Sequence, residues 1–226
     1  MVGPILYFKN DSPPVRSVKL CLLSLDLTVQ LKQVTFAPGE TLDTAFLKQN
    51  PRRSLPALVD GDLLICDSHA INAYLVSAYG KNDVLYPKDS KDRALVDQRL
   101  YFDAGEIFPT IKQIAVNIFS KKATHLDEET VGKIRTIYAT TEQFLKGRKY
   151  IASDVISIAD FSYFTSLTTL EVFLPELDDY PNVVRYLLTC MDTIPGCHDD
   201  RTVYIANFNA LYQAAVERNR SLDDPS

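Results

Sequence analysis

The stretch LPALVDGDLLICDSHAINAYLVSAYG, residues 55–80, contains two short apolar runs followed by one helical pattern. The apolar runs, 55–59 and 63–66, are separated by an Asp-Gly-Asp segment that is typical of a hairpin turn. Asp67-Ser68 then supplies residues that favour a helix start, and Gly80 marks the end of the apolar periodicity. The stretch therefore predicts a β-hairpin followed by a helix.

The residues before this hairpin alternate between strand and helix patterns. Residues 5–8 form a short apolar run that predicts a buried strand. Ser12 and two prolines lead into a helical pattern over 15–25, and prolines are tolerated in the first turn of a helix. A second strand is expected near 29–31 and a short helix over 41–49. The expected order is β-α-β-(α)-β-β-α, with Ser12 at the start of the first helix.

Two details of this first segment are open to test. Val15, Val18 and Leu22 recur at helical spacing, which leaves Arg16 and Lys19 on other faces of the helix. Pro56 begins a strand although proline cannot donate to a β-ladder, so an edge position or a special turn is expected there, with a cis Leu55–Pro56 bond as one form of it.

The second half of the chain keeps a helical period almost to its end. A linker is expected over 82–90, because strand signals stop there and apolar residues then recur near every 3.6 positions. The sequence thus predicts an α/β domain over 1–81 and an all-α domain over 90–220. Ser157 and Asp160 have the spacing of a capping box. The helices are expected at about 91–120, 127–145, 157–170, 181–193 and 204–219.

Composition excludes several classes of function. The chain has 226 residues and a net charge of −5, without the basic run that nucleic-acid binding would favour. No apolar run is long enough for a membrane span, and the N-terminus does not resemble a signal peptide, so a cytoplasmic protein is expected. The four cysteines are scattered and are expected to be reduced. No histidine or cysteine spacing indicates a metal site, so no metal is expected.

Several motifs in one order resemble a known family. They are Ser12-Pro13-Pro14-Val15-Arg16, the run from Asn50 to Leu58, Asp67-Ser68-His69-Ala70-Ile71, Tyr86-Pro87-Lys88-Asp89 and Ser157-Ile158-Ala159-Asp160-Phe161. Together they resemble the insect cytosolic glutathione transferases, most closely the epsilon class, with the delta class as neighbour. The resemblance covers residues 4–200. It implies a thioredoxin-like N-terminal domain, an α-helical C-terminal domain and a homodimer.

The resemblance implies that Ser12 activates the thiol of glutathione. A thiol must ionise to become a good nucleophile, and lowering its pKa by two units requires about 2.7 kcal/mol of preferential thiolate stabilisation. A serine hydroxyl and a helix N-terminus both favour a nearby anion. The simpler interpretation is that Ser12 only caps the helix.

The resemblance also implies a glutathione site and an acceptor site. Glutathione is expected to contact Thr41, Arg53, Ser54, Leu55, Pro56, Asp67, Ser68 and His69. Arg53 and Thr41 stand where the family commonly has histidine, and a solvated surface charge is the alternative for Arg53. Ordinary helix capping is the alternative for Asp67 and Ser68. A pocket for a hydrophobic electrophile is expected at Pro14, Phe36, Phe108, Ile111, Lys112, Ala115, Val116, Phe119, Phe208 and Leu211, where core packing is the alternative.

Three functions follow from these observations. The leading hypothesis is a transferase that conjugates glutathione to hydrophobic electrophiles, a detoxifying activity to which peroxidase activity could be added. The second is a weakly catalytic protein of the same fold that binds lipophilic hormones or pigments, which the Arg53 and Thr41 departures motivate. The third, a thiol–disulfide enzyme, would require a cysteine where Ser12 stands.

Overall fold

A four-stranded mixed sheet with the strand order β2-β1-β3-β4 forms the first part of the chain. In this computed structural model, residues 3–9, 12–34, 46, 48, 50 and 53–223 are described. β1 (Ile5–Phe8) pairs in parallel with β2 (Gln30–Gln33), which requires the crossover supplied by α1 (Pro13–Ser24). β3 (Ala57–Asp60) pairs antiparallel with β1 and, through the expected hairpin, with β4 (Leu63–Ile65).

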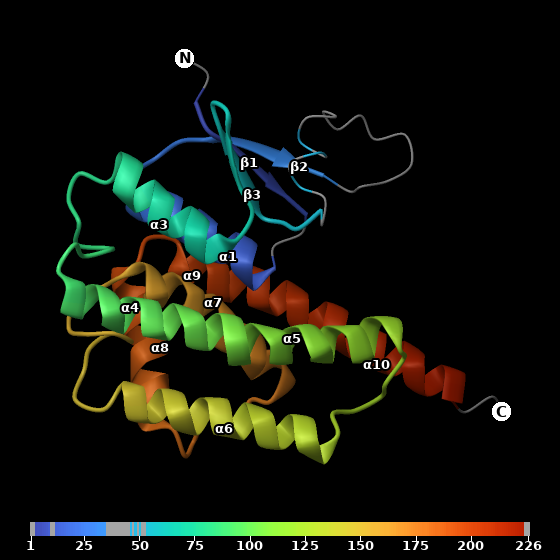
Figure 1. The fold of residues 1–226 in the computed structure, drawn as a ribbon. Coiled ribbons are helices and arrows are strands. Elements are labelled where there is room, and N and C mark those ends of the chain that lie inside the picture. The colour runs from blue at the N-terminus through green and yellow to red at the C-terminus, as the bar shows by residue number, and fades with distance from the viewer. Residues whose placement is uncertain are drawn as a thin grey trace.

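The helices α1 and α3 (Ser68–Tyr79) lie between the sheet and the helical part of the molecule (Figure 1). Leu6 and Leu58 from the sheet, Val18 from α1 and Leu75 from α3 are fully or almost fully buried in one apolar cluster, which continues into the helical domain. The two parts of the chain therefore share a continuous core.

A long helical segment runs from residue 90 to residue 120 and contains two turns of π-helix. It consists of α4 (Ser90–Phe102), the π-turn η1 (Asp103–Ile107), α5 (Phe108–Ala115) and the π-turn η2 (Val116–Ser120). The remaining elements are α6 (Glu128–Phe144), α7 (Ile158–Phe173), α8 (Pro181–Thr193), α9 (Cys197–Asp199), the π-turn η3 (Asp200–Ile205) and α10 (Ala206–Asp223).

Helix α7 is the centre of the helical domain, and its sequence explains its start. The Ser157 N–H donates to the Asp160 carboxylate at 2.7 Å, and the Ile151 N–H donates to its other oxygen at 2.9 Å. These bonds confirm the expected capping box. Burial raises the pKa of Asp160 to about 6, although the hydrogen bonds from Ile151 and Ser157 act to lower it.

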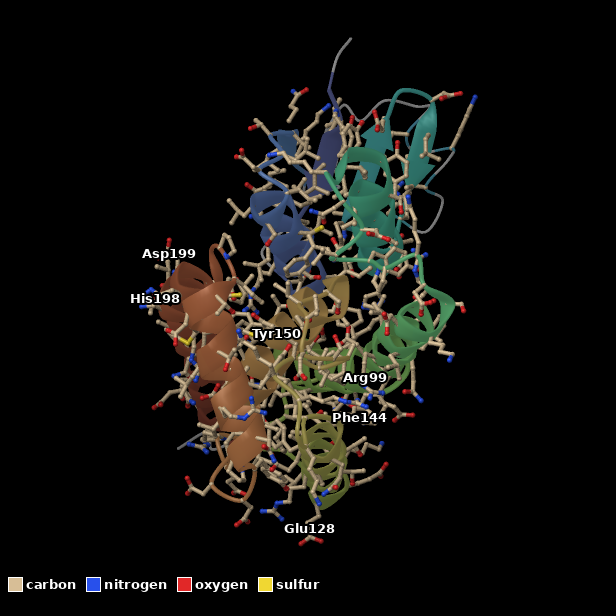
Figure 2. The ribbon with its side chains drawn as sticks, turned by 90° about the vertical axis from the view of Figure 1, so that its left-hand side faces the viewer. Arg99, Glu128, Phe144, Tyr150, His198 and Asp199 are labelled. Atoms are coloured by element: carbon tan, nitrogen blue, oxygen red, sulfur yellow. The ribbon has the colours of Figure 1, made fainter. Side chains whose placement is uncertain are left out.

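An arginine joins α4 to α6 away from the sheet. The Arg99 guanidinium lies 3.6 Å from the centre of the Phe144 ring, and its Nε donates to the Ile151 carbonyl at 3.1 Å. Figure 2 shows these two side chains side by side, with Glu128 at the far end of α6. The contact buries a charged group against an aromatic face, which suits guanidinium better than ammonium.

Most element boundaries agree with the expectations, and the start of the last helical segment differs. The last helical segment begins at Cys197, before the expected residue 204, because η3 continues directly into α10. Gly80 ends α3 as expected, but with an extended backbone; a Cβ there would lie 2.4 Å from the Val76 carbonyl oxygen. The Leu55–Pro56 bond is cis.

The expected helix over 41–49 falls largely outside the described residues, of which Phe46 and Lys48 are helical. No helix in the described part of the chain is long and apolar enough to span a membrane. The domain limits 1–81 and 90–220 stay predictions.

Candidate active site

Ser12 stands at the N-terminal end of α1 with its hydroxyl unused for capping. The first two residues of the helix are Pro13 and Pro14, which have no N–H, and the Ser12 side chain makes no capping hydrogen bond. Its carbonyl oxygen accepts the Arg16 N–H at 3.0 Å, so the backbone is fixed while the hydroxyl is left for another partner. The prolines also remove two amide donors that an anion at this helix end could otherwise use.

Ser12 lies in the wall of a cavity of about 580 Å³ between α1 and the helical domain. The lining residues come from α1, α5, η2, α7, η3 and α10, and most of them are apolar. They are Ser12, Pro13, Phe108, Ile111, Lys112, Ala115, Phe119, Thr169, Tyr204, Asn207, Phe208 and Leu211.

The cavity contains most of the expected acceptor residues and omits two. Pro14 does not line it, because each helical residue is turned about 100° from the one before, and Pro13 takes that place. Val116 does not line it either; it begins the π-turn η2, where the register departs from the regular α-helical period. Phe36 lies outside the described residues.

Four lining residues were not anticipated from the sequence: Pro13, Thr169, Tyr204 and Asn207. Pro13 directly follows Ser12, so its place in the cavity wall could have been predicted from the sequence. Tyr204 belongs to a π-turn that the sequence pattern placed only at the start of a regular helix. Tyr212, one turn beyond Phe208 on α10, lines a different cavity of about 640 Å³.

Arg16 is buried beside the cavity, on a face of α1 other than that of Val15, Val18 and Leu22. Its side chain is only 2% exposed and forms a bidentate ion pair with Asp200, in which 2.7 Å separates Nε from Oδ1. The same guanidinium donates to the hydroxyls of Thr168 and Thr169, both at 2.9 Å, and to the Thr165 carbonyl. The buried charge is therefore fully paired.

The Arg16 guanidinium also covers one of the aromatic residues of the cavity wall. Its central carbon lies 4.1 Å from the centre of the Tyr204 ring. On the neighbouring helix, the Thr165 hydroxyl donates to the Pro13 carbonyl oxygen at 3.1 Å. These contacts fix the beginning of α1, and hence Ser12, against α7 and η3.

The start of α3 is the second place where expected site residues gather. The Asp67 carboxylate accepts the N–H groups of His69 at 2.9 Å and Ala70 at 3.1 Å, so it caps the helix. One Asp67 oxygen makes both bonds, and the side chain is 59% exposed. Ser68, the first helical residue, is buried. Capping therefore leaves the second carboxylate oxygen of Asp67 accessible.

His69 is directed toward the helical domain. Its Nε2 lies 2.9 Å from the Oδ2 of Asp103 in η1. Burial, the largest influence, lowers the pKa of His69, but the hydrogen bond and charge of Asp103, with the charge of Asp67, together raise it above its ordinary value. The other oxygen of Asp103 is buried without a hydrogen-bond partner. The pair connects the two domains next to Asp67.

A buried asparagine holds the loop before β3. The Asn50 side chain accepts the Ser54 N–H at 3.1 Å and donates to the Ser54 carbonyl at 2.9 Å, and it is only 2% exposed. Arg53 lies between them with φ of 49°, a left-handed conformation that is unfavourable for a non-glycine residue. Sequence reasoning missed the role of Asn50, whose side chain fixes the approach to Leu55. Thr41 lies outside the described residues.

The cysteines show no redox pair. Cys21, Cys190 and Cys197 are free and buried, and burial raises the pKa of each thiol. Cys66 is free and half-buried. In the described ranges, no group of three or more His, Cys, Asp or Glu side chains could hold a metal ion.

A sheet domain that presents a serine to a cavity roofed by an all-helical domain has the architecture of the glutathione transferases. Family models of the glutathione S-transferase N-terminal and C-terminal domains match residues 6–83 and 87–193. Glutathione S-transferase D7 of Anopheles gambiae is 36% identical over 193 residues, which cover 85% of this chain and 88% of that protein.

Solved structures give the same result. A glutathione transferase homologue from Drosophila mojavensis with bound glutathione is 39% identical, covers 97% of this chain and 98% of its own, and has a TM-score of 0.84. An epsilon-class glutathione S-transferase from the housefly, Musca domestica, is 38% identical, covers 94% and 98%, and has a TM-score of 0.85. The chain belongs to the glutathione S-transferase family. These relatives confirm the expected family and fold and favour the transferase over the non-catalytic alternative.

Proposed function

We propose that Ser12 activates the thiol of glutathione and that the cavity beside it holds the lipophilic electrophile that the sulfur attacks. The observation that carries this proposal is the Ser12 hydroxyl, which is left free of capping at the wall of a mostly apolar cavity. A hydroxyl that donates to sulfur stabilises the thiolate, so the thiol loses its proton to solvent more easily. The thiolate then forms a C–S bond with the acceptor while the leaving group departs with its electron pair.

The glutathione peptide would lie along the edge formed by the start of α3 and the loop before β3. The second Asp67 oxygen would accept the γ-glutamyl ammonium, and the Ser68 backbone at the helix start would favour the neighbouring carboxylate. Leu55 would offer its backbone to the cysteinyl part, beside Pro56 and Ser54. Arg53 would bind the glycine carboxylate. His69 contributes through Asp103, by holding the start of α3 in place.

The assembly and location of the protein are part of the same proposal. A homodimer and a cytoplasmic location are expected, as the resemblance to cytosolic glutathione transferases implies. Sedimentation equilibrium would test the dimer. A mass equal to one chain across micromolar concentrations would contradict it.

Replacing Ser12 with Ala tests the mechanism. We expect kcat/KM with a model aryl halide to fall by about ten- to hundred-fold or more, as for the loss of one positioned donor. Ultraviolet titration of enzyme-bound glutathione should show a higher thiol pKa in the variant. Ser24→Ala is the matched control, because Ser24 lies at the other end of α1 and its buried Oγ has no hydrogen-bond partner. Normal turnover and an unchanged thiol pKa in Ser12→Ala would refute the proposal.

A further inference from the structure

The polar groups of the acceptor cavity divide into those already engaged and those left for a ligand. The Thr169 hydroxyl accepts from Arg16 at 2.9 Å and donates to the Thr165 carbonyl at 2.8 Å, so it is engaged inside the protein. The Ser12 hydroxyl faces the glutathione sulfur in the proposed mechanism. Besides the phenol ring of Tyr204, Lys112 and Asn207 are the remaining polar residues that line the cavity in the described chain.

Lys112 places an unneutralised positive charge in the wall of the cavity. Its side chain is exposed, and in the described chain it takes part in no ion pair or hydrogen bond. No Asp or Glu is among the described residues that line the cavity. The other nearby cation, Arg16, is paired with Asp200, so Lys112 determines the charge that a bound acceptor meets. Asn207 adds an exposed amide at the same cavity.

Lys112 favours an anionic group on the acceptor, whereas the aromatic residues of η3 and α10 favour a flat apolar group. The rings of Tyr204 and Phe208 are almost parallel, at 8°, with their centres 6.0 Å apart. Phe208 also contacts Phe119 at 6.4 Å across the cavity wall. Aromatic faces of this kind favour planar conjugated ligands, which stack on them with more contact area than a bulky aliphatic group.

We propose that the preferred acceptors are planar aromatic electrophiles that carry a carboxylate or similar anionic group, with Lys112 binding that group while the ring packs against Tyr204 and Phe208. This assignment rests on the proposed function and adds to it the substrate class. A negatively charged chain would otherwise repel such acceptors. Because Lys112 is exposed, its contribution is a moderate preference and depends on salt.

A pair of aryl chlorides tests the assignment. One is the chloronitrobenzoate anion with chlorine ortho to the nitro group, and the other is its neutral methyl ester. In both, the thiolate forms a C–S bond at the ring carbon and the C–Cl bond breaks to release chloride. The intrinsic reactivity of the two rings differs, but it cancels when each variant is compared with the wild type on the same substrate.

We expect Lys112→Gln to lower the ratio of kcat/KM for the anion to kcat/KM for the ester by about three- to ten-fold. Lys112→Glu should lower the ratio further, and the wild-type ratio should fall as salt is added. Lys121→Gln is the matched control, since it removes the same charge from the end of η2 without lining the cavity, and it should leave the ratio unchanged.

The possible results distinguish a failure of the Lys112 assignment from a failure of the proposed transferase function. Equal losses for anion and ester, or no loss for either, would overturn the assignment of Lys112. An increase in the KM for glutathione with both acceptors would also overturn it, because Lys112 would then serve the co-substrate. If the wild type conjugates neither compound nor any other aryl halide or epoxide, the proposed function itself fails, and the acceptor class with it.

Discussion

The Arg16 guanidinium and the Asp200 carboxylate join the first helix of the sheet domain to the last helical segment of the chain. The two residues are separated by 184 positions in the sequence, yet both are almost fully buried. Arg16 follows Ser12 by one helical turn, and Tyr204 follows Asp200 by one turn in η3. The ion pair therefore fixes Ser12, which faces the glutathione sulfur in the proposed mechanism, relative to Tyr204 in the wall of the acceptor cavity.

Replacing Asp200 with Ala should lower the free energy of unfolding by about 3 kcal/mol, because it leaves a buried guanidinium without its carboxylate. The KM for the acceptor should rise more than the KM for glutathione, since Tyr204 loses its support. Urea denaturation and steady-state kinetics check both effects. Asp199→Ala is the control: Asp199 and His198 lie at the surface (Figure 2), and the Asp199 side chain is 89% exposed. Similar losses in both variants would argue against this role.

Ser12→Ala should leave the stability of the protein almost unchanged. Loss of a capping serine costs about 0.5–2 kcal/mol, but the Ser12 side chain makes no capping bond. We expect the free energy of unfolding, measured with urea in the absence of glutathione, to change by less than about 0.5 kcal/mol. A loss above about 1 kcal/mol would show that Ser12 acts as a helix cap.

The His69–Asp103 pair should stabilise the fold most in mild acid. The folded pKa of His69 is raised, so the ion pair contributes fully below the ordinary imidazole pKa of 6.5 and is lost as pH rises through the folded value. His69→Gln should therefore cost more stability near about pH 5.5 than near about pH 9. The exposed His125 gives the control variant His125→Gln, and denaturation at the two pH values is the measurement. A pH-independent cost would rule out an ionic contribution.

Asn50→Ala should weaken glutathione binding through the loop that it holds. The change leaves the Ser54 N–H and carbonyl without their side-chain partners and costs about 2 kcal/mol of stability. Calorimetry should show weaker glutathione binding, whereas the KM for the acceptor changes little at saturating glutathione. Asn209→Ala, on the exposed part of α10, serves as the control. Unchanged glutathione affinity in a destabilised Asn50→Ala variant would limit Asn50 to a folding role.

Local features of the chain were predictable because their partners are close in sequence. The hairpin at residues 57–65, the Asp67 cap and the Ser157–Asp160 box each depend on residues within a few positions. Helical periodicity predicted which aromatic and aliphatic residues of α5 line the cavity. The order of the two domains followed from the point where the apolar period changes.

Other features depend on distant partners or on departures from regular geometry. The burial of Arg16 requires Asp200 and Thr169, which no local pattern connects to it. Helical periodicity wrongly places Val116, the first residue of the π-turn η2, in the cavity wall, and it does not indicate Tyr204, which lies in the π-turn η3. Asn50 resembles any loop asparagine until the Ser54 backbone is seen to need both of its hydrogen-bonding groups. The assignment of site residues to glutathione stays a prediction.

The position of Arg16 over the Tyr204 ring sets a size limit on acceptors that is not purely steric. An acceptor wide enough to displace the Tyr204 ring would remove the cation–π contact of the Arg16 guanidinium and disturb its ion pair with Asp200. Binding of an oversized acceptor thus carries an electrostatic cost, even where the neighbouring side chains could repack to admit it.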